Sequence, residues 1–230
     1  MTGLATLLLL ADGRFPAGGH AHSGGLEPAV SAGSVRDLST LEAFLRGRLA
    51  TAGLVAAAFA AAAAGDPASG DPAAGDPAAA TAGVARLDEA LDARTPSPAQ
   101  RRASRSQGRA LLRAGRSIWR LPEHLPTAPH HPVALGVVAA AAGLTPHQAA
   151  LAAVHGSIAG PASAAVRLLG LDPYGVHAVL ARLAADCERI AAEAGDRAGT
   201  DPDALPAAAA PLLDIGAEIH ADWEVRLFAS

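Results

Sequence analysis

A chain of 230 residues can bury a sizeable core, and half of this one is hydrophobic, chiefly Ala with Leu and Val. Its formal net charge of −4 does not indicate nucleic acid as a partner, and all 18 basic residues are Arg, which excludes a Walker-A or Schiff-base lysine. The single Cys187 excludes an internal disulfide and a cysteine-rich zinc site. Because Ala and Leu favour helices whereas strands favour β-branched and aromatic residues, the composition predicts an all-α protein.

The first predicted helix is the apolar run Leu4–Ala11. It lacks the basic region of a signal peptide and is too short to span a membrane, so we expect a cytoplasmic protein. A second short helix is expected at about Gly24–Ser31, with Ser23 as its N-cap.

The segment "STLE" has the spacing of a capping box, with Ser39 as N-cap and Glu42 three residues later. It predicts a helix that continues to about Ala64. The apolar positions with the spacing of one buried face are Leu41, Leu45, Leu49, Ala52 and Val55. The repeat "GDPASGDPAAGDPAA" follows, and its Gly and Pro predict a disordered low-complexity loop at about 65–82.

A short helix is expected at about Val84–Ala93, and a longer one after it. Ser97 as N-cap, Pro98 at the first helical position and Gln100 two residues later form a start signal, and Pro122 is the expected stop. One predicted stripe of this helix is apolar and comprises Ala103, Ala110, Ala114, Ile118 and Leu121.

Arginine is concentrated on the same helix, where residues 97–120 hold seven Arg and no acid. The rest of the chain, with 11 Arg against 22 acidic residues, sums to −11. A row at helical spacing comprises Arg105, Arg109, Arg113, Arg116 and Arg120. This row indicates either docking of an acidic partner or phosphate, or internal pairing with the surplus acids, and the sequence favours neither.

The remaining elements are also predicted helices. One ends near Gly143, the next begins with Thr145 as its cap, and Pro161 within it predicts a kink. Small residues in that helix predict close helix contact at Gly156, Ala159, Gly160 and Ala162. Asp172 caps a further amphipathic helix, and a last helix covers about Pro211–Trp223. The total is about eight to ten helices in a single domain, 1–230.

The stretch "GGHAHSGGLE" suggests two kinds of site. Gly19 and Gly24 have P-loop spacing, but Gly25 and Leu26 stand where Lys and Ser or Thr are required, so the glycines indicate a tight turn. Two histidines remain as candidate nickel or zinc ligands, with further ligands expected from elsewhere. The histidines concerned are His20 and His22, with His130 and His131 as the expected additions. Hydrogen-bonded loop histidines are the alternative interpretation.

No catalytic motif is apparent, since the chain has neither G-x-S-x-G nor H-E-x-x-H. The polar C-terminal group around Asp214 and His220 is the only candidate for a hydrolase site. Asp214 and Glu218 share a helix face, where like charges repel slightly.

Three ordered segments resemble the UreF family of urease accessory proteins. The first is "LLLLADGRFPAGGHAHSGGLEPAVSAGSVRDLSTLEAFL", the second is "SQGRALLR", and the third is the ending "PLLDIGAEIHADWEVRLFAS". The central stretches "HPVALGVVAAAAGL" and "VHGSIAGPASAAVRLLGLDP" are also similar to the family.

The resemblance implies an all-helical, homodimeric scaffold without catalysis or cofactor of its own. Its partners would be UreD (also called UreH), the GTPase UreG and, through the complex, apo-urease, for GTP-dependent nickel insertion. A nickel-binding metallochaperone that uses His20 and His22 is the alternative. The partner-binding residues that the resemblance implies are Gly18, Gly19, Ser23, Gly25, Glu27, Gln107, Gly108, Arg109, Asp214, His220, Arg226, Leu227, Phe228 and Ser230. On a free C-terminal tail, Phe228 would fill a partner's pocket.

Overall fold

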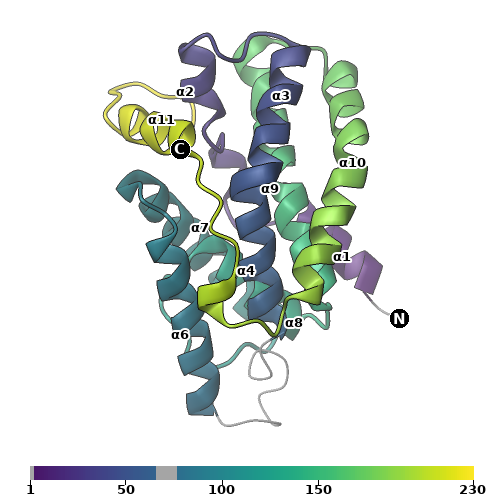
Figure 1. Ribbon diagram of the computed structural model, residues 1–230, viewed down its shortest axis with the longest axis vertical. Coiled ribbons are helices and arrows are strands. Elements are labelled where there is room, and N and C mark those ends of the chain that lie inside the picture. Colours follow the sequence, from purple (N-terminus) through teal and green to yellow (C-terminus); the bar gives the residue numbers. More distant parts are fainter. Residues whose placement is uncertain (1–2, 66–76) are drawn as a thin grey trace.

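Two apolar helices, α4 (Leu54–Gly65) and α9 (Pro146–Leu169), form the centre of the computed structural model, which describes residues 3–65 and 77–230. Helix α8 (His131–Ala141) packs on α4, and α10 (Pro173–Asp196) packs on α9. Within those residues the structure is helical and contains no strand, which confirms the predicted all-α class (Figure 1).

The outer helices surround this centre. Helix α1 (Gly3–Ala11) packs on α9, and α3 (Leu38–Arg48) continues through a π-helical turn (Leu49–Gly53) into α4. On the opposite side from α10 lie α7 (Pro98–Arg116) and, outside it, α6 (Pro77–Ala93). The remaining helices α2 (Leu26–Ser31) and α11 (Pro211–Ala221) pack against each other, and the C-terminus lies beside them (Figure 1).

Alanine and glycine at the contacts allow the central helices to approach closely. A Cβ added to Gly136 of α8 would lie 2.3 Å from the carbonyl oxygen of Ala60 and 2.6 Å from Cβ of Ala63, both in α4. Two helical runs, Leu38–Gly65 and α9, are long and apolar enough to cross a membrane, but 56% of the most apolar window of each is buried. These helices therefore form the core of this fold.

Three of the predicted helix starts are confirmed. The side chain of Ser97 accepts a hydrogen bond from the N–H of Gln100, Thr145 caps α9, and Asp172 caps α10. The predicted N-cap Ser39 is wrong, because α3 begins at Leu38. Asp37 caps this helix, and its Oδ1 accepts the N–H of Thr40 at 2.8 Å. Aspartate is among the strongest N-caps, and the side chain of Thr40 in turn accepts the backbone N–H of Asp37.

Several predicted boundaries also change. Helix α6 begins at Pro77, so residues 77–82 of the loop predicted at 65–82 are helical; residues 66–76 of that loop lie outside the described residues. Helix α7 ends at Arg116 and not at Pro122, because Ser117 ends it in a turn. Ile118, predicted in the apolar stripe, is therefore exposed. The last helix ends at Ala221, two residues before the predicted end.

The close helix contact predicted at Gly156 and Gly160 of α9 is wrong, whereas Ala162 of the same set is buried in the core. A Cβ added to Gly156 or Gly160 would meet no atom within 4 Å, and α9 runs through Pro161 without interruption. Both glycines line a cavity instead. A tighter contact between two helices lies at Gly136, between α8 and α4.

Gly136→Ala is expected to destabilise the fold by about 1–3 kcal/mol, because its methyl group would displace the backbone of α4. Urea unfolding followed by circular dichroism measures the change. Gly156→Ala is the matched control in another helix interior; it is expected to be neutral or stabilising by up to about 1 kcal/mol. Equal effects of the two substitutions would contradict the assigned packing.

Candidate functional site

A buried carboxylate, that of Glu27, connects the first part of the chain to its end. Glu27 lies in the first turn of α2, and its two oxygens accept the backbone N–H groups of Leu227 at 2.8 Å and Phe228 at 3.0 Å. Nε2 of His220, on α11, lies 2.9 Å from the same carboxylate. Glu27 and His220 are both buried. Residues about 200 positions apart are therefore joined at one side chain.

The pKa of Glu27 reflects two opposing causes. Burial favours the protonated form and raises the pKa of the carboxyl group. The hydrogen bonds from Leu227, His220 and Phe228 outweigh this effect, so its pKa lies below the ordinary value. The Glu27 carboxyl group is therefore ionised at neutral pH, and it is this charged carboxylate that holds the C-terminal segment.

The last two residues pair with the loop that precedes α2. The N–H and Oγ–H groups of Ser23 both donate to the carbonyl oxygen of Ser230, at 2.6 and 2.9 Å. Ala229 donates its N–H to the carbonyl oxygen of Ala21 at 2.7 Å, and Nδ1 of His22 lies 2.6 Å from Oγ of Ser230. These contacts fix the end of the chain against the opening loop.

Glycine conformation shapes this loop. Gly25 is the residue before α2 and has a φ of 86°, in the left-handed region that favours glycine. The predicted start of this helix at Gly24 is therefore two residues too early. The N-cap position is occupied by Gly25 and not by the predicted Ser23. Its Oγ nevertheless accepts the N–H of Glu27 at 3.2 Å. The turn brings Ser23 and Glu27 to the same side, where both meet the C-terminal segment.

The prediction of a free C-terminal tail is wrong. Phe228 is only 4% exposed, packs within the core of its own chain, and has the guanidinium carbon of Arg167 4.6 Å from its ring centroid. Its neighbours Val225 and Leu227, by contrast, are 88% and 52% exposed. The segment thus anchors one aromatic side chain internally and presents two aliphatic ones outward.

Two acidic residues of α11 face the start of α7. Oε1 of Glu218 accepts the hydroxyl of Ser97 and the N–H of Ala99, the latter at 2.8 Å. Burial raises the pKa of Asp214, and the nearby Glu218 adds to this, although a backbone hydrogen bond from Ser97 opposes it. The N-terminus of α7 is the positive end of that helix, and it offsets the repulsion expected between Asp214 and Glu218. Asp214 faces α7 whereas His220 is bonded to Glu27, so this arrangement does not support the hydrolase site considered above.

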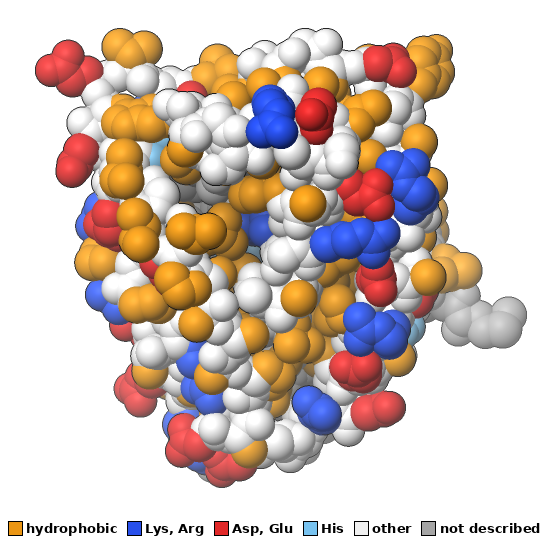
Figure 2. Space-filling model, turned by 45° about the horizontal axis from the view of Figure 1, so that its top comes forward, with side chains coloured by type: hydrophobic (Ala, Val, Ile, Leu, Met, Phe, Trp, Pro, Cys, Tyr) orange, Lys and Arg blue, Asp and Glu red, His pale blue; other side chains and the backbone are white. Residues whose placement is uncertain are grey.

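The outer face of α11 is apolar and exposed. Leu212, Ile215 and Ile219 lie at helical spacing and are 85%, 57% and 54% exposed. Figure 2 shows hydrophobic side chains gathered around a hollow, whereas basic and acidic side chains alternate along the opposite edge. That edge carries the ion pairs between α3 and α10, such as Arg182 with Glu42. We call Leu212, Ile215, Ile219, Val225 and Leu227 the apolar face.

A cavity of about 1030 Å³ lies between the opening loop, α7, α8, α9 and α11. Seven of the partner-binding residues that the resemblance implies line it, namely Gly19, Gly25, Gln107, Asp214, His220, Phe228 and Ser230. The candidate metal ligands His20, His22, His130 and His131 line it as well. Gly108 instead lies against the backbone of Pro129, which a Cβ would meet at 1.9 Å. Arg109 is exposed. The structure therefore gathers the two ends of the chain around one cavity and leaves Gly108 and Arg109 outside it.

The four candidate metal-binding histidines do not form one cluster. His130 is buried, with Nδ1 3.0 Å from Oγ of Ser104 and Nε2 3.0 Å from Asp92, so both ring nitrogens are engaged. Burial, with His22 nearby, lowers the pKa of His131 to about 4. Across residues 3–65 and 77–230, no group of three or more His, Cys, Asp or Glu is placed to hold a metal ion.

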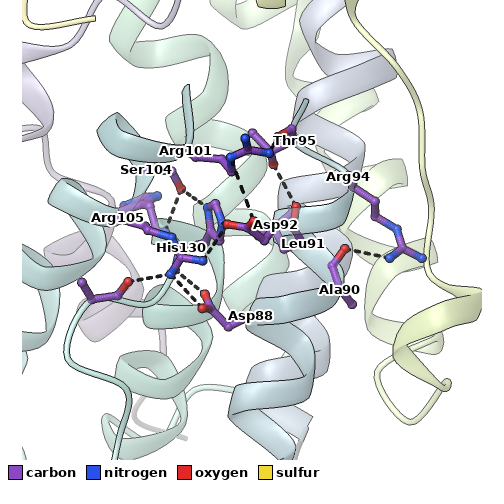
Figure 3. A network of polar contacts seen from close by, with 12 residues as sticks. Asp88, Ala90, Leu91, Asp92, Arg94, Thr95, Arg101, Ser104, Arg105 and His130 are labelled. Carbon is purple, nitrogen blue, oxygen red and sulfur yellow. Dashed lines mark hydrogen bonds and ion pairs between the residues drawn. The ribbon is translucent and has the colours of Figure 1, made fainter. Parts of the chain in front are cut away.

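The arginine row of α7 divides into two parts. Arg105 binds Asp88 at 2.8 Å and Asp92 at 2.6 Å, both in α6, within the network that also holds His130 at the start of α8 (Figure 3). This part is internal and joins three helices. Arg109, Arg113 and Arg116 are exposed on α7 and make no ion pair with the described residues. Arg120, predicted in the same row, lies beyond the end of α7 and is exposed there. Internal pairing is therefore confirmed for Arg105, and docking of an acidic partner or phosphate stays a prediction for the exposed arginines.

Four arginines that the sequence analysis did not single out line the cavity, and they include Arg48 and Arg167. Arg48 lies seven residues after Leu41, on the face that the apolar spacing assigns to the core. An arginine at a core position was the available signal for Arg48. Arg167 gave none, because its aromatic partner Phe228 lies far along the chain.

These features define an all-helical protein whose main exposed surfaces, an apolar helix face and an arginine row, are suited to binding other proteins. The family model described as UreF matches residues 35–184, more than half of the chain. The chain is 48% identical to the urease accessory protein UreF of Mycobacterium sp. (strain JLS) and 45% identical to that of Mycobacterium tuberculosis (strain ATCC 25618 / H37Rv). Both alignments cover 100% of each chain. The chain therefore belongs to the UreF family of urease accessory proteins.

Glu27→Gln is expected to destabilise the protein by about 2 kcal/mol at pH 7, because the amide leaves part of the buried N–H groups without an acceptor. The folded-state pKa of Glu27 is lowered, so its contribution is present above the ordinary value of 4.5 and is lost as the pH falls below it. Urea unfolding of both proteins at pH 7 and pH 4 measures this difference.

Glu224→Gln is the matched control, since Glu224 lies exposed in the same segment. It should leave stability unchanged at both pH values. A Glu27→Gln effect that is absent, or that is equally large at both pH values, would contradict the role assigned to the charged carboxylate.

Proposed function

We propose that this protein is a scaffold in urease maturation, which bridges apo-urease with UreD to the GTPase UreG for GTP-dependent nickel insertion. The observation that carries the proposal is the apolar face, where three aliphatic side chains of α11 and two of the adjoining C-terminal segment are each more than half exposed. Apolar surface gathered in this way is typical of protein interfaces. Membership of a family of urease accessory proteins supplies the biological setting.

The apolar face is assigned to UreD. Its helix is held from beneath by Glu27 and by the start of α7, so its exposed side chains are already positioned. A surface that needs little ordering loses less entropy on binding. On this account Glu27, Ser23 and His220 contribute by fixing the segment, whereas Leu227 contacts the partner directly.

The exposed arginines of α7, together with Arg120 just beyond its end, provide a second surface of different chemistry. Arg109, Arg113, Arg116 and Arg120 are suited to an acidic partner surface, and we assign them to the UreG side of the complex. A chain without lysine cannot supply a Walker-A motif, so the nucleotide belongs on the partner. A cytoplasmic homodimer without nucleic acid or membrane as partner completes the proposal.

The apolar face is tested by Leu212→Glu combined with Ile215→Glu. Both side chains point to solvent, so the variant should keep its stability but lose co-purification with UreD by about tenfold or more, as expected for charges placed in an apolar interface. Tyr174→Glu, at an 86% exposed site on α10, is the control and should leave co-purification unchanged. Undiminished co-purification of the double variant would contradict the assignment.

The metallochaperone alternative is tested by isothermal titration of Ni²⁺ into the wild type and into His20→Ala/His22→Ala. Because Nδ1 of His22 lies at Ser230 and no third ligand is near in the described structure, we expect no micromolar binding that depends on these two residues. Micromolar binding in the wild type that disappears in the variant would establish the alternative.

A further inference from the structure

Arg48 is a partly buried cation of the cavity lining, and it has no acidic partner among the described residues. Its Nε donates to the carbonyl oxygen of Ser157 at 3.0 Å, and Nη1 donates to that of Gly24. No carboxylate in the described part of the chain lies within ion-pair distance of it, and Nη2 makes no hydrogen bond there. Burial alone accounts for the direction of its pKa, which is lowered to about 10, so the group stays charged at neutral pH.

The other arginines around the cavity are already neutralised or occupied. Arg14 pairs with Asp12 at 2.8 Å, and Arg167 lies over the ring of Phe228. The guanidinium of Arg94 donates to five backbone carbonyl oxygens, among them that of Ala90 at 2.8 Å. Arg14 and Arg167 are exposed to solvent, so Arg48 is the partly buried arginine of the lining with the fewest protein acceptors.

The acidic side chains that line the cavity do not change this balance. The lining holds two, Asp12 and Asp214, against four arginines. Asp12 is paired with Arg14, and Asp214 is directed to the start of α7 by its bond with Ser97. A charge withdrawn from water is costly unless it is paired, so this cavity favours a negatively charged occupant beside the partly buried Arg48 and disfavours a bare cation.

The local backbone places Arg48 at this position. It is the last residue of α3, and the π-helical turn Leu49–Gly53 follows at once. Single π turns inside helices occur frequently at functional sites, because the inserted residue redirects neighbouring side chains. Gly24 has a φ of 62°, and a Cβ there would lie 3.2 Å from Nη2 of Arg48, so glycine leaves room at the guanidinium.

We propose that this cavity is a binding site for a small molecule carrying a carboxylate or phosphate group, with Arg48 as the residue that binds the anionic group. The volume of about 1030 Å³ exceeds that of an inorganic ion and matches sites for small organic ligands. Ser163 and His155 also line the cavity and offer further polar groups near the occupant. Neither the family assignment nor the scaffold proposal includes such a ligand.

The test is a titration of the full-length ¹⁵N-labelled protein, observed at the Nε–Hε signal of Arg48. Acetate, inorganic phosphate, benzoate and phenyl phosphate are added separately at constant ionic strength, with sodium chloride as the blank. A saturable shift that chloride does not produce is expected. At least tenfold tighter binding of benzoate or phenyl phosphate than of acetate or phosphate identifies an organic ligand, and equal affinities identify a free oxyanion.

Arg48→Met should weaken binding of the anions by about tenfold or more, as expected for the loss of a charge-assisted bond. Arg48→Lys keeps the charge and should retain part of the affinity. Arg46→Met, two residues away in an exposed ion pair with Glu42, is the matched control and should bind as the wild type does.

Two results would overturn the proposal. One is an Arg48 signal that moves no more with these anions than with chloride, a result that needs no variant to fold. The other is a folded Arg48→Met protein that binds the anions as tightly as the wild type.

Discussion

The charged carboxylate of Glu27 is the constraint on which the rest of the site depends. It is buried, and it is stable there because N–H groups from Leu227, Phe228 and His220 converge on it. Two of these donors belong to the C-terminal segment and one to α11. A single side chain near the start of the chain therefore orients the last helix and the chain terminus together.

A second carboxylate completes the positioning of α11. Glu218 caps the start of α7, so the helix is fixed on α2 at one contact and on α7 at another. With its polar groups satisfied inward, the apolar side chains Leu212, Ile215 and Ile219 remain on the outside. The apolar face is thus exposed because Glu218 and Glu27 bind the polar side of α11 inward. This supports a binding interface in preference to incomplete packing.

The sequence was sufficient for elements that local chemistry specifies. Ser97, Thr145 and Asp172 cap their helices because an oxygen side chain before a helical run satisfies free N–H groups. The contacts of Glu27 were not predictable in this way, since their donors lie about 200 residues away. The family resemblance singled out Glu27, His220 and Phe228 without indicating that they meet within one chain.

Other errors have equally specific causes. The small residues of α9 suggested helix contact, but smallness at Gly156 serves a cavity, and spacing alone does not distinguish the two. The regular spacing of the arginines did not indicate that Arg105 lies opposite Asp88 and Asp92 while the other arginines of the row face solvent. In both cases the partner element across the helix decides the role, and this is tertiary information.

The most direct test of the scaffold account is amide hydrogen exchange of the full-length protein, alone and with UreD. The account predicts that the amides of Leu227 and Phe228 are protected before UreD is added, because Glu27 already holds them. It further predicts that addition of UreD increases protection on α11 and the C-terminal segment. Rapid exchange of these two amides in the free protein, or new protection confined to other helices, would contradict a preformed binding face.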